Sequence, residues 1–312
     1  MKKLLSSLIV ASLLVLPSQA EEKKKQTTAE HLQNVSVTIR AEGEFSAGEG
    51  SGVIFTRKDA KGNLVNFVWT AGHVIDNLRS TRSVVVDGKD KTLVEFKDPL
   101  VVKEIRQNGR TVGRLQMDAE VLKYSDAKDG HDLALLRVRK HNFVEDTVTF
   151  YLEEKIPPLG EDLLHVGSLL GQMGANSMTD GIYSQHGRLI KSLNKHVFDQ
   201  TTCTAFPGSS GGGVYLKSDA RYVGMLVRGA GEGFNLIVPT RRMQDYCEKH
   251  KIMWALDGKV KMPTEEELKK LPIEHESKGK TEETEEESTA KKLFPFRLRV
   301  TYPKILILKE KN

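Results

Sequence analysis

This chain of 312 residues has no long apolar run, only two cysteines and a small net charge. The run from Leu4 to Leu16 is too short for a comfortable membrane span, so we expect no stable span in the mature chain. The net charge of +5 is mild for this length and no recognition motif accompanies it, which argues against a nucleic-acid partner. No internal repeat is visible. The composition is globular, with room for one good-sized domain and additional segments.

Residues 1–20 have the features of a secretory signal peptide. A basic start precedes the apolar run, and Pro17 and the small residues Ser18 and Ala20 follow it. This pattern predicts cleavage after Ala20 and export, to the periplasm or the extracellular space, because both destinations use the same signal. An uncleaved N-terminal anchor is the alternative. No cysteine follows the run, so a lipid-anchored start is not expected.

The two cysteines, Cys203 and Cys247, are an even count, and export would permit a disulfide between them. Such a bond would tie the segment before Ser210 to a C-terminal helix. Two buried free thiols are the alternative, and the sequence alone leaves both open.

The middle of the chain has the pattern of a β protein. Residues 21–30 are charged and expected to be loose, but from His31 short runs rich in Val, Ile, Thr and Phe alternate with Gly, Asp, Asn and Lys clusters. These runs are 35–39, 52–55, 65–69, 83–86, 133–138, 148–152, 187–190, 213–216, 222–227 and 235–238. They predict an all-β sandwich or barrel, and they argue against a parallel α/β fold.

The β pattern ends at Pro239. Apolar and aromatic residues then recur at three- and four-residue steps, which predicts a C-terminal helix with Thr240 as its N-cap and Gly258 just past its end. The residues on this face are Met243, Tyr246, Cys247, His250 and Trp254. We therefore expect a domain over 31–258, a charged low-complexity linker over 259–292, disordered or helical, and an apolar and basic tail over 293–312.

Three residues could together carry out serine-based hydrolysis, which needs a nucleophile, a base and an acid that orients the base. His73 follows a β run and small residues, and Asp132 opens an apolar strand, where an unpaired carboxylate would be costly. Ser210 lies among glycines, whose conformational freedom lets the N–H groups of Gly208, Ser209 and Ser210 converge as an anion-binding nest. Each residue alone has a structural explanation, but the three together are far more specific.

These motifs resemble those of the trypsin-like serine proteases, and within them the protease domain of the bacterial HtrA/Deg type. The resemblance covers about residues 31–250 and rests on five motifs. They are GSGVIF at 50–55, TAGHV at 70–74, DLALL at 132–136, GSSGG at 208–212 and GEGFNLIVP at 231–239.

The resemblance implies two six-stranded antiparallel β-barrels with the active site in the cleft between them, followed by the C-terminal helix. His73 and Asp132 would come from the first barrel and Ser210 from the second, with the N–H groups of Gly208 and Ser210 as the oxyanion hole. No metal or organic cofactor is implied. The chain departs from the family at Ser209, where Asn or Asp is usual, and at Gly213, where Pro is usual. Residues 261–312 are too few and too charged for a PDZ domain.

The same resemblance suggests how substrate would be chosen. Thr204, six residues before Ser210, would lie at the base of the S1 pocket, and its lack of charge gives no support for a Lys or Arg preference. The strand over 224–229 would form a pocket wall and pair with an extended substrate. Its residues Met225, Leu226 and Val227 suggest a small or medium apolar P1 residue. Arg228 suggests an acidic P1 residue instead, unless it is simply a solvated charge.

We therefore predict an exported serine endopeptidase that cleaves protein or peptide substrates through an acyl-enzyme intermediate. The alternative is a catalytically silent trypsin-fold protein that acts as a binding module or envelope scaffold. The sequence predicts no oligomeric state.

Overall fold

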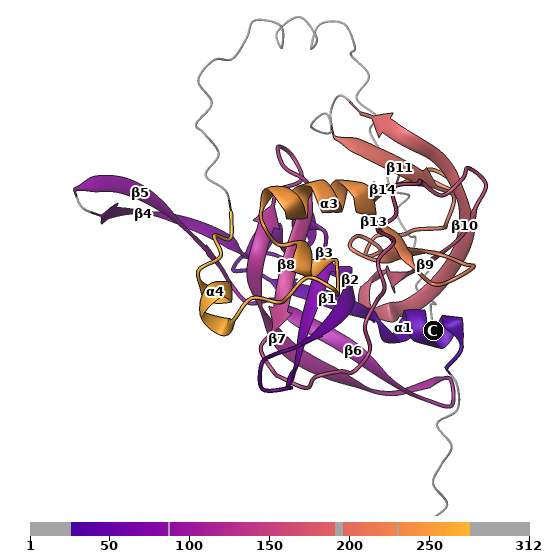
Figure 1. Cartoon of the computed structure of the whole chain (residues 1–312), viewed down its shortest axis with the longest axis horizontal. Coiled ribbons are helices and arrows are strands. Elements are labelled where there is room, and N and C mark those ends of the chain that lie inside the picture. Colours follow the sequence, from indigo (N-terminus) through magenta and orange to yellow (C-terminus); the bar gives the residue numbers. More distant parts are fainter. Residues whose placement is uncertain (1–25, 87, 191–195, 230, 275–312) are drawn as a thin grey trace, which may run out of the picture. The chain divides into compact units, whose positions relative to one another are not determined.

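Two closed β-barrels form the body of the protein. The structure is a computed structural model that describes residues 26–86, 88–190, 196–229 and 231–274 (Figure 1). The first barrel has the strand order β1-β2-β3-β8-β7-β6. Its strands are β1 (Ser36–Glu42), β2 (Ala47–Lys58), β3 (Leu64–Thr70), β6 (Leu100–Gln107), β7 (Arg110–Ser125) and β8 (Leu133–Val138). Apolar side chains such as Val53, Phe67 and Leu135 fill its interior.

The second barrel has the order β10-β11-β14-β13-β12-β9, and all paired strands in both barrels are antiparallel. Its strands are β9 (Asp162–Leu169), β10 (Gly174–Leu189), β11 (Val197–Thr201), β12 (Gly213–Leu216), β13 (Tyr222–Gly229) and β14 (Asn235–Pro239). The predicted all-β fold of two six-stranded barrels is confirmed.

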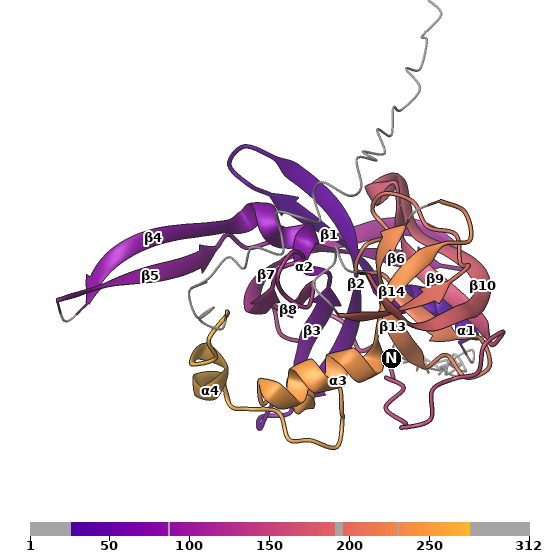
Figure 2. The ribbon, with the colours of Figure 1, turned by 90° about the horizontal axis from the view of Figure 1, so that it is seen from above.

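Nine of the ten predicted runs overlap strands, but residues 148–152 do not form one. That stretch connects the barrels and makes a single bridge, between Phe150 and Tyr222. A further pair, β4 (Arg79–Val86) and β5 (Lys89–Phe96), forms a separate two-stranded sheet. Figures 1 and 2 show this hairpin projecting away from the first barrel.

The C-terminal helix ends earlier than the apolar spacing of the sequence predicted. Helix α3 (Thr240–Lys249) packs on β13 and β14 and ends before Trp254, which lies on a separate 3-10 turn, η3 (Met253–Ala255). Pro239 rather than Thr240 is its N-cap, because the Thr240 hydroxyl donates to the carbonyl of Val223 instead. The prediction of a helix here is confirmed, whereas its cap and its end were misplaced.

Packed structure continues on both sides of residues 31–258. Helix α1 (Thr28–Asn34) begins inside the segment expected to be loose and is stabilised by a capping box between Thr27 and Glu30. After residue 258, helix α4 (Glu265–Lys269) buries Leu268 and places Glu265 beside Arg137 of β8. The charged linker is therefore helical and docked over its first part.

Some expectations fall on residues that lie outside the described part of the chain. The signal peptide at 1–20 and the tail at 293–312 are both in this group. Among the described residues, no helix combines the length and apolar character that a membrane crossing requires.

Candidate active site

His73 and Asp132 face each other at one end of the first barrel. Strand β3 ends at Thr70, and His73 lies in the short helix α2 (Gly72–Ile75) that follows. The imidazole Nδ1 of His73 lies 2.9 Å from Oδ1 and 3.0 Å from Oδ2 of Asp132, and the backbone N–H of His73 donates to Oδ1 at 3.0 Å. Asp132 therefore fixes both the ring and the backbone of His73.

Asp132 is held in a conformation that few residues other than glycine adopt. Its φ is +56°, in the left-handed region, and its backbone N–H donates to the carbonyl of Asp126. The side chain is only 4% exposed, whereas that of His73 is 29% exposed. Burial alone would raise the pKa of Asp132, but the hydrogen bonds and charge of His73 and the charge of Arg228 hold that pKa below its usual value. The carboxylate is thus charged and pointed at the imidazole.

The loop before Ser210 is a tight turn that positions backbone N–H groups. The N–H of Ser209 donates to the carbonyl of Phe206 at 2.9 Å, with Pro207 and Gly208 at the two central positions. Gly208 has a φ of +95°, and a Cβ there would lie 2.3 Å from the carbonyl oxygen of Ser168, so only glycine fits. This sequence is typical of a type II turn.

Both departures from the family pattern have a structural explanation. The side chain of Ser209 is fully buried, and its hydroxyl accepts the backbone N–H of Phe206, which closes the turn from inside. At Gly213 an added Cβ would lie 2.2 Å from the hydroxyl of Tyr215, so the ring of Tyr215 occupies the space that a larger residue would need. Ser209 therefore braces the turn through its hydroxyl, and glycine at 213 leaves room for Tyr215.

Strand β2 of the first barrel holds this loop of the second barrel. The backbone N–H of Ser51 donates to the carbonyl of Ser210, and its hydroxyl donates to the carbonyl of Gly208, both at 2.7 Å. Next to it, a Cβ on Gly50 would lie 3.1 Å from the Ser210 carbonyl oxygen and 2.6 Å from Val74, the neighbour of His73. These contacts bring Ser210 to the same end of the barrels as the His73–Asp132 pair.

The two N–H groups predicted as oxyanion donors make no hydrogen bond within the described residues. Among the described residues, neither the N–H of Gly208 nor that of Ser210 donates a hydrogen bond, whereas the N–H of Ser209 is used in the turn. The nest suggested by the sequence is thus reduced to two donors. The hydroxyl of Ser210 makes no hydrogen bond to His73 within the same part of the chain.

Arg228 from β13 also reaches the pair. Its Nη1 lies 3.0 Å from Nδ1 of His73 and 3.2 Å from Oδ2 of Asp132, and it donates to the carbonyl of Val227. Arg228 is therefore neither a freely solvated charge nor aimed at a separate pocket.

The other residues expected to select the substrate, Thr204 and the strand residues 225–227, do not form the pocket that the sequence suggested. Thr204 is exposed, and its carbonyl accepts the hydroxyl of Thr179. Met225, Leu226 and Val227 are each at most 2% exposed, because their side chains pack into the cores of the molecule. At these three positions a substrate can meet only the backbone, so the predicted apolar wall gains no support from their side chains.

Cys203 and Cys247 are both buried free thiols, not the disulfide partners that the sequence also allowed. They belong to two different apolar clusters, one around Tyr183 and Val214 and the other around Met243. Burial raises the pKa of Cys203 to about 11 and also raises that of Cys247, so neither is a ready nucleophile.

His165 of β9 is a supporting residue that the sequence reasoning missed. It is fully buried, its Nδ1 lies 3.0 Å from the carbonyl oxygen of Gly213, and a Cβ on Gly212 would lie 2.7 Å from the ring. Its Nε2 is buried without a partner among the described residues, and burial lowers its pKa to about 4. The run DLLHVGSL at 162–169 gives no signal of this role, because the contact depends on strand pairing.

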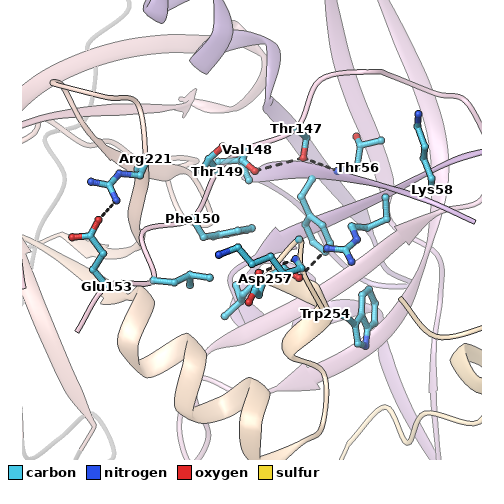
Figure 3. Close-up of a pocket in the computed structure, with 16 residues that line it drawn as sticks. Thr56, Lys58, Thr147, Val148, Thr149, Phe150, Glu153, Arg221, Trp254 and Asp257 are labelled. Carbon is cyan, nitrogen blue, oxygen red and sulfur yellow. Dashed lines mark hydrogen bonds and ion pairs between the residues drawn. The ribbon is translucent and has the colours of Figure 1, made fainter. Parts of the chain in front are cut away.

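A cavity of about 780 Å³ lies between β2, the segment that connects the barrels and the turn η3 (Figure 3). The ion pair of Glu153 and Arg221 stands at one end of it, and Lys58 at the other. None of the candidate catalytic or substrate-specificity residues discussed above lines this cavity. Within the described ranges, no group of three or more His, Cys, Asp or Glu side chains is placed to hold a metal ion.

Comparisons with known proteins agree with this architecture. The profile of the trypsin-like peptidase domain family matches residues 50–225. The serine protease Do-like HtrA of Lactobacillus helveticus is 29% identical over 180 residues, which is 57% of this chain and 35% of that protein. The chain thus spans about a third of the length of this curated relative.

Two solved structures share the fold. The serine endoprotease from Yersinia pestis has a TM-score of 0.50 at 21% identity, over 71% of this chain and 64% of that one. An HtrA-type protease solved with a tripeptide has a TM-score of 0.52 at 17% identity, over 73% and 64%.

Proposed function

This chain belongs to the trypsin-like peptidase family and carries a serine endopeptidase domain of the HtrA type, and we propose that it cleaves peptide bonds with Ser210, His73 and Asp132. One observation carries the proposal. The hydrogen bonds of Ser51 to the carbonyls of Gly208 and Ser210 hold Ser210 at the end of the barrels where the His73–Asp132 pair lies.

In the proposed reaction, the hydroxyl of Ser210 attacks the scissile carbonyl carbon while Nε2 of His73 takes its proton. The tetrahedral intermediate collapses to an acyl-enzyme when His73 gives that proton to the leaving amine. Water then attacks the ester, again with His73 as base, and releases Ser210. Asp132 holds the proton on Nδ1, so that Nε2 keeps its lone pair, and stabilises the imidazolium that forms.

The oxyanion would be stabilised by the unbonded N–H groups of Gly208 and Ser210. Removal of one such donor in another serine protease cost about a hundredfold to a thousandfold in turnover. The hydroxyl of Ser51 holds the carbonyl of Gly208, and the peptide unit of that carbonyl lies between these two N–H groups, so the hydrogen bond limits rotation of the loop that carries them.

We also propose that an extended peptide pairs with the end of β13. Strand β12 begins at Gly213, which pairs with Met225, so the stretch 227–229 of β13 runs past the end of β12. An uncovered strand edge binds an extended segment through main-chain hydrogen bonds. Thr204 gives no support for a Lys or Arg preference at P1, and a small or medium apolar P1 residue remains the hypothesis.

The test is hydrolysis of labelled casein by the mature protein, with Ser210→Ala beside wild type and Ser218→Ala as matched control. Ser218 is exposed in the turn after β12, so its loss should change nothing. Loss of the nucleophile in another serine protease cost about a millionfold in turnover.

We expect activity in wild type and Ser218→Ala only, and modification of Ser210 by a serine-directed phosphonate. Equal activity in Ser210→Ala would refute this nucleophile. Absence of both activity and labelling in wild type would favour the silent scaffold.

The proposal includes export, which rests on residues 1–20 of the sequence. N-terminal sequencing of protein recovered from the periplasm or medium should read from Glu21. A chain that keeps Met1 in the membrane fraction would favour the uncleaved anchor.

A further inference from the structure

Arg228 places a positive charge directly against the histidine that the proposed reaction uses as base. The Nη1 of Arg228 lies 3.0 Å from Nδ1 of His73 and 3.2 Å from Oδ2 of Asp132. The arginine comes from β13 of the second barrel, whereas both partners come from the first. The contact therefore bridges the barrels at the catalytic pair.

Nδ1 of a neutral imidazole can either donate or accept in the ring plane, but not both. Donation to Asp132 leaves a lone pair on Nε2, which general-base catalysis needs. Acceptance from Arg228 requires the proton on Nε2, where it prevents uptake of the proton of Ser210. The guanidinium also repels the positive charge that His73 gains in the reaction, and it shares the carboxylate that should stabilise that charge.

Building on the proposed function, we propose that Arg228 is a positioning residue that holds the His73–Asp132 pair in a resting state, and that an acidic side chain of the substrate releases the pair by drawing the guanidinium away. The resting state is the arrangement seen here. Release removes the competing donor and leaves Asp132 as the partner of Nδ1, which keeps the proton on Nδ1 and makes Nε2 available to Ser210.

A substrate carboxylate can reach Arg228. The arginine side chain is 31% exposed, and it follows a bulge at the end of β13, on the stretch that runs past β12. A peptide paired with this stretch has side chains beside Arg228. A carboxylate can bind the guanidinium through two parallel hydrogen bonds, so the arginine exchanges one anion for another when it leaves Asp132.

The proposal predicts that the enzyme prefers Glu to Gln in the substrate, and that this preference appears in kcat as well as in KM. Two matched sets of fluorogenic peptides would carry Glu or Gln at each position before the cleavage site. At one of these positions, kcat should be higher for the Glu peptide. A charged hydrogen bond of this kind corresponds to about tenfold to a hundredfold in rate. In Arg228→Met, which keeps the length but not the charge, kcat for Gln peptides should rise by a similar factor and the Glu preference should disappear. Arg228→Gln serves as a second uncharged variant if Arg228→Met does not fold.

The state of His73 supplies a readout that loss of structure would not mimic. In Arg228→Met at neutral pH, a low-field proton resonance of Nδ1–H bound to Asp132 should appear, and in wild type it should appear only when a non-cleavable Glu peptide is added. The same Glu peptide should accelerate phosphonate labelling of Ser210 in wild type and not in Arg228→Met, with the Gln peptide as control.

The outcomes separate the two proposals. If Ser210 is labelled and active but Glu and Gln peptides have equal kcat, and Arg228→Met changes neither, the role of Arg228 is overturned while the triad stands. If kcat falls in Arg228→Met with an unchanged melting temperature, Arg228 assists catalysis and the resting-state proposal is wrong. If Ser210 is neither labelled nor active in any variant, both proposals fail.

Discussion

His165 should make the protein lose stability as the pH falls below about 6.5. The imidazole is fully buried under the loop of Ser210, and burial lowers its pKa to about 4 from an ordinary value of about 6.5. The unfolded chain therefore binds a proton between these two values and the folded chain does not. The stability that His165 provides is complete above pH 6.5 and is lost as the pH falls towards 4.

The size of the effect follows from the two pKa values. For a single group of this kind, the free energy of unfolding should fall by about 2 kcal/mol between pH 7 and pH 5. His165→Asn removes the titrating ring, while its amide nitrogen can still donate to the carbonyl of Gly213, as Nδ1 does. The smaller side chain should cost about 1 to 2 kcal/mol at pH 7, but the variant should then lose about 2 kcal/mol less than wild type on acidification.

Urea unfolding at half-unit steps from pH 7 to pH 5 measures this difference directly. His141→Asn is the matched control, because His141 is an exposed histidine and its replacement should leave the wild-type slope intact. Parallel pH curves for wild type and His165→Asn would refute the reasoning, since they would mean that the buried ring does not control acid stability.

Two further changes test the geometry of the loop and the role of α4. Gly208→Ala should abolish activity and destabilise the protein by about 1 to 3 kcal/mol, because its Cβ meets the carbonyl of Ser168. Gly62→Ala, with a similar φ of +85° and open space around it, should cost about 1 kcal/mol and keep activity; equal behaviour of both in casein hydrolysis and thermal melts would contradict this explanation. A chain that ends at Gly258 should stay active but lose about 2 kcal/mol, because it exposes the apolar site that Leu268 covers and removes the Pro272 carbonyl that binds Lys123. An unchanged melting temperature would show that the docked segment adds no stability.

The parts of the site that are local in sequence could be predicted. His73, Asp132 and the loop of Ser210 each carry their signal within a few residues, as small residues before an imidazole, an acid at a strand start, or glycines around a serine. Nine strands of the described residues overlap predicted runs, because burial leaves an apolar pattern in each of those runs. Strand β7 and much of the β4–β5 hairpin were missed since they are largely exposed, whereas β6, β9 and β11 were missed because polar residues such as Lys103, His165 and Asp199 interrupt their apolar pattern although these residues are buried.

Contacts between distant segments could not be predicted from one sequence. Arg228 and His73 are 155 residues apart and meet only because the barrels dock, so the sequence suggested a pocket or solvent as the arginine's environment. The capping boxes at Thr27 and Thr264 are local, but both lie in charged segments where apolar periodicity is weak. The choice between a disulfide and free thiols likewise depends on where Cys203 and Cys247 lie in space, which spacing does not reveal.

The hydrogen bonds of Ser51 have a consequence for the order in which the protein folds. The nucleophile loop of the second barrel takes its shape from a strand of the first, which is complete at Val138, some seventy residues before Ser210. A chain that has folded only its first barrel brings His73 and Asp132 together without Ser210. A second barrel that folds alone holds the serine without the strand that shapes its loop. Under the proposed function, proteolytic competence would arise last, when the two barrels dock, so a half-folded chain would not cleave the proteins around it.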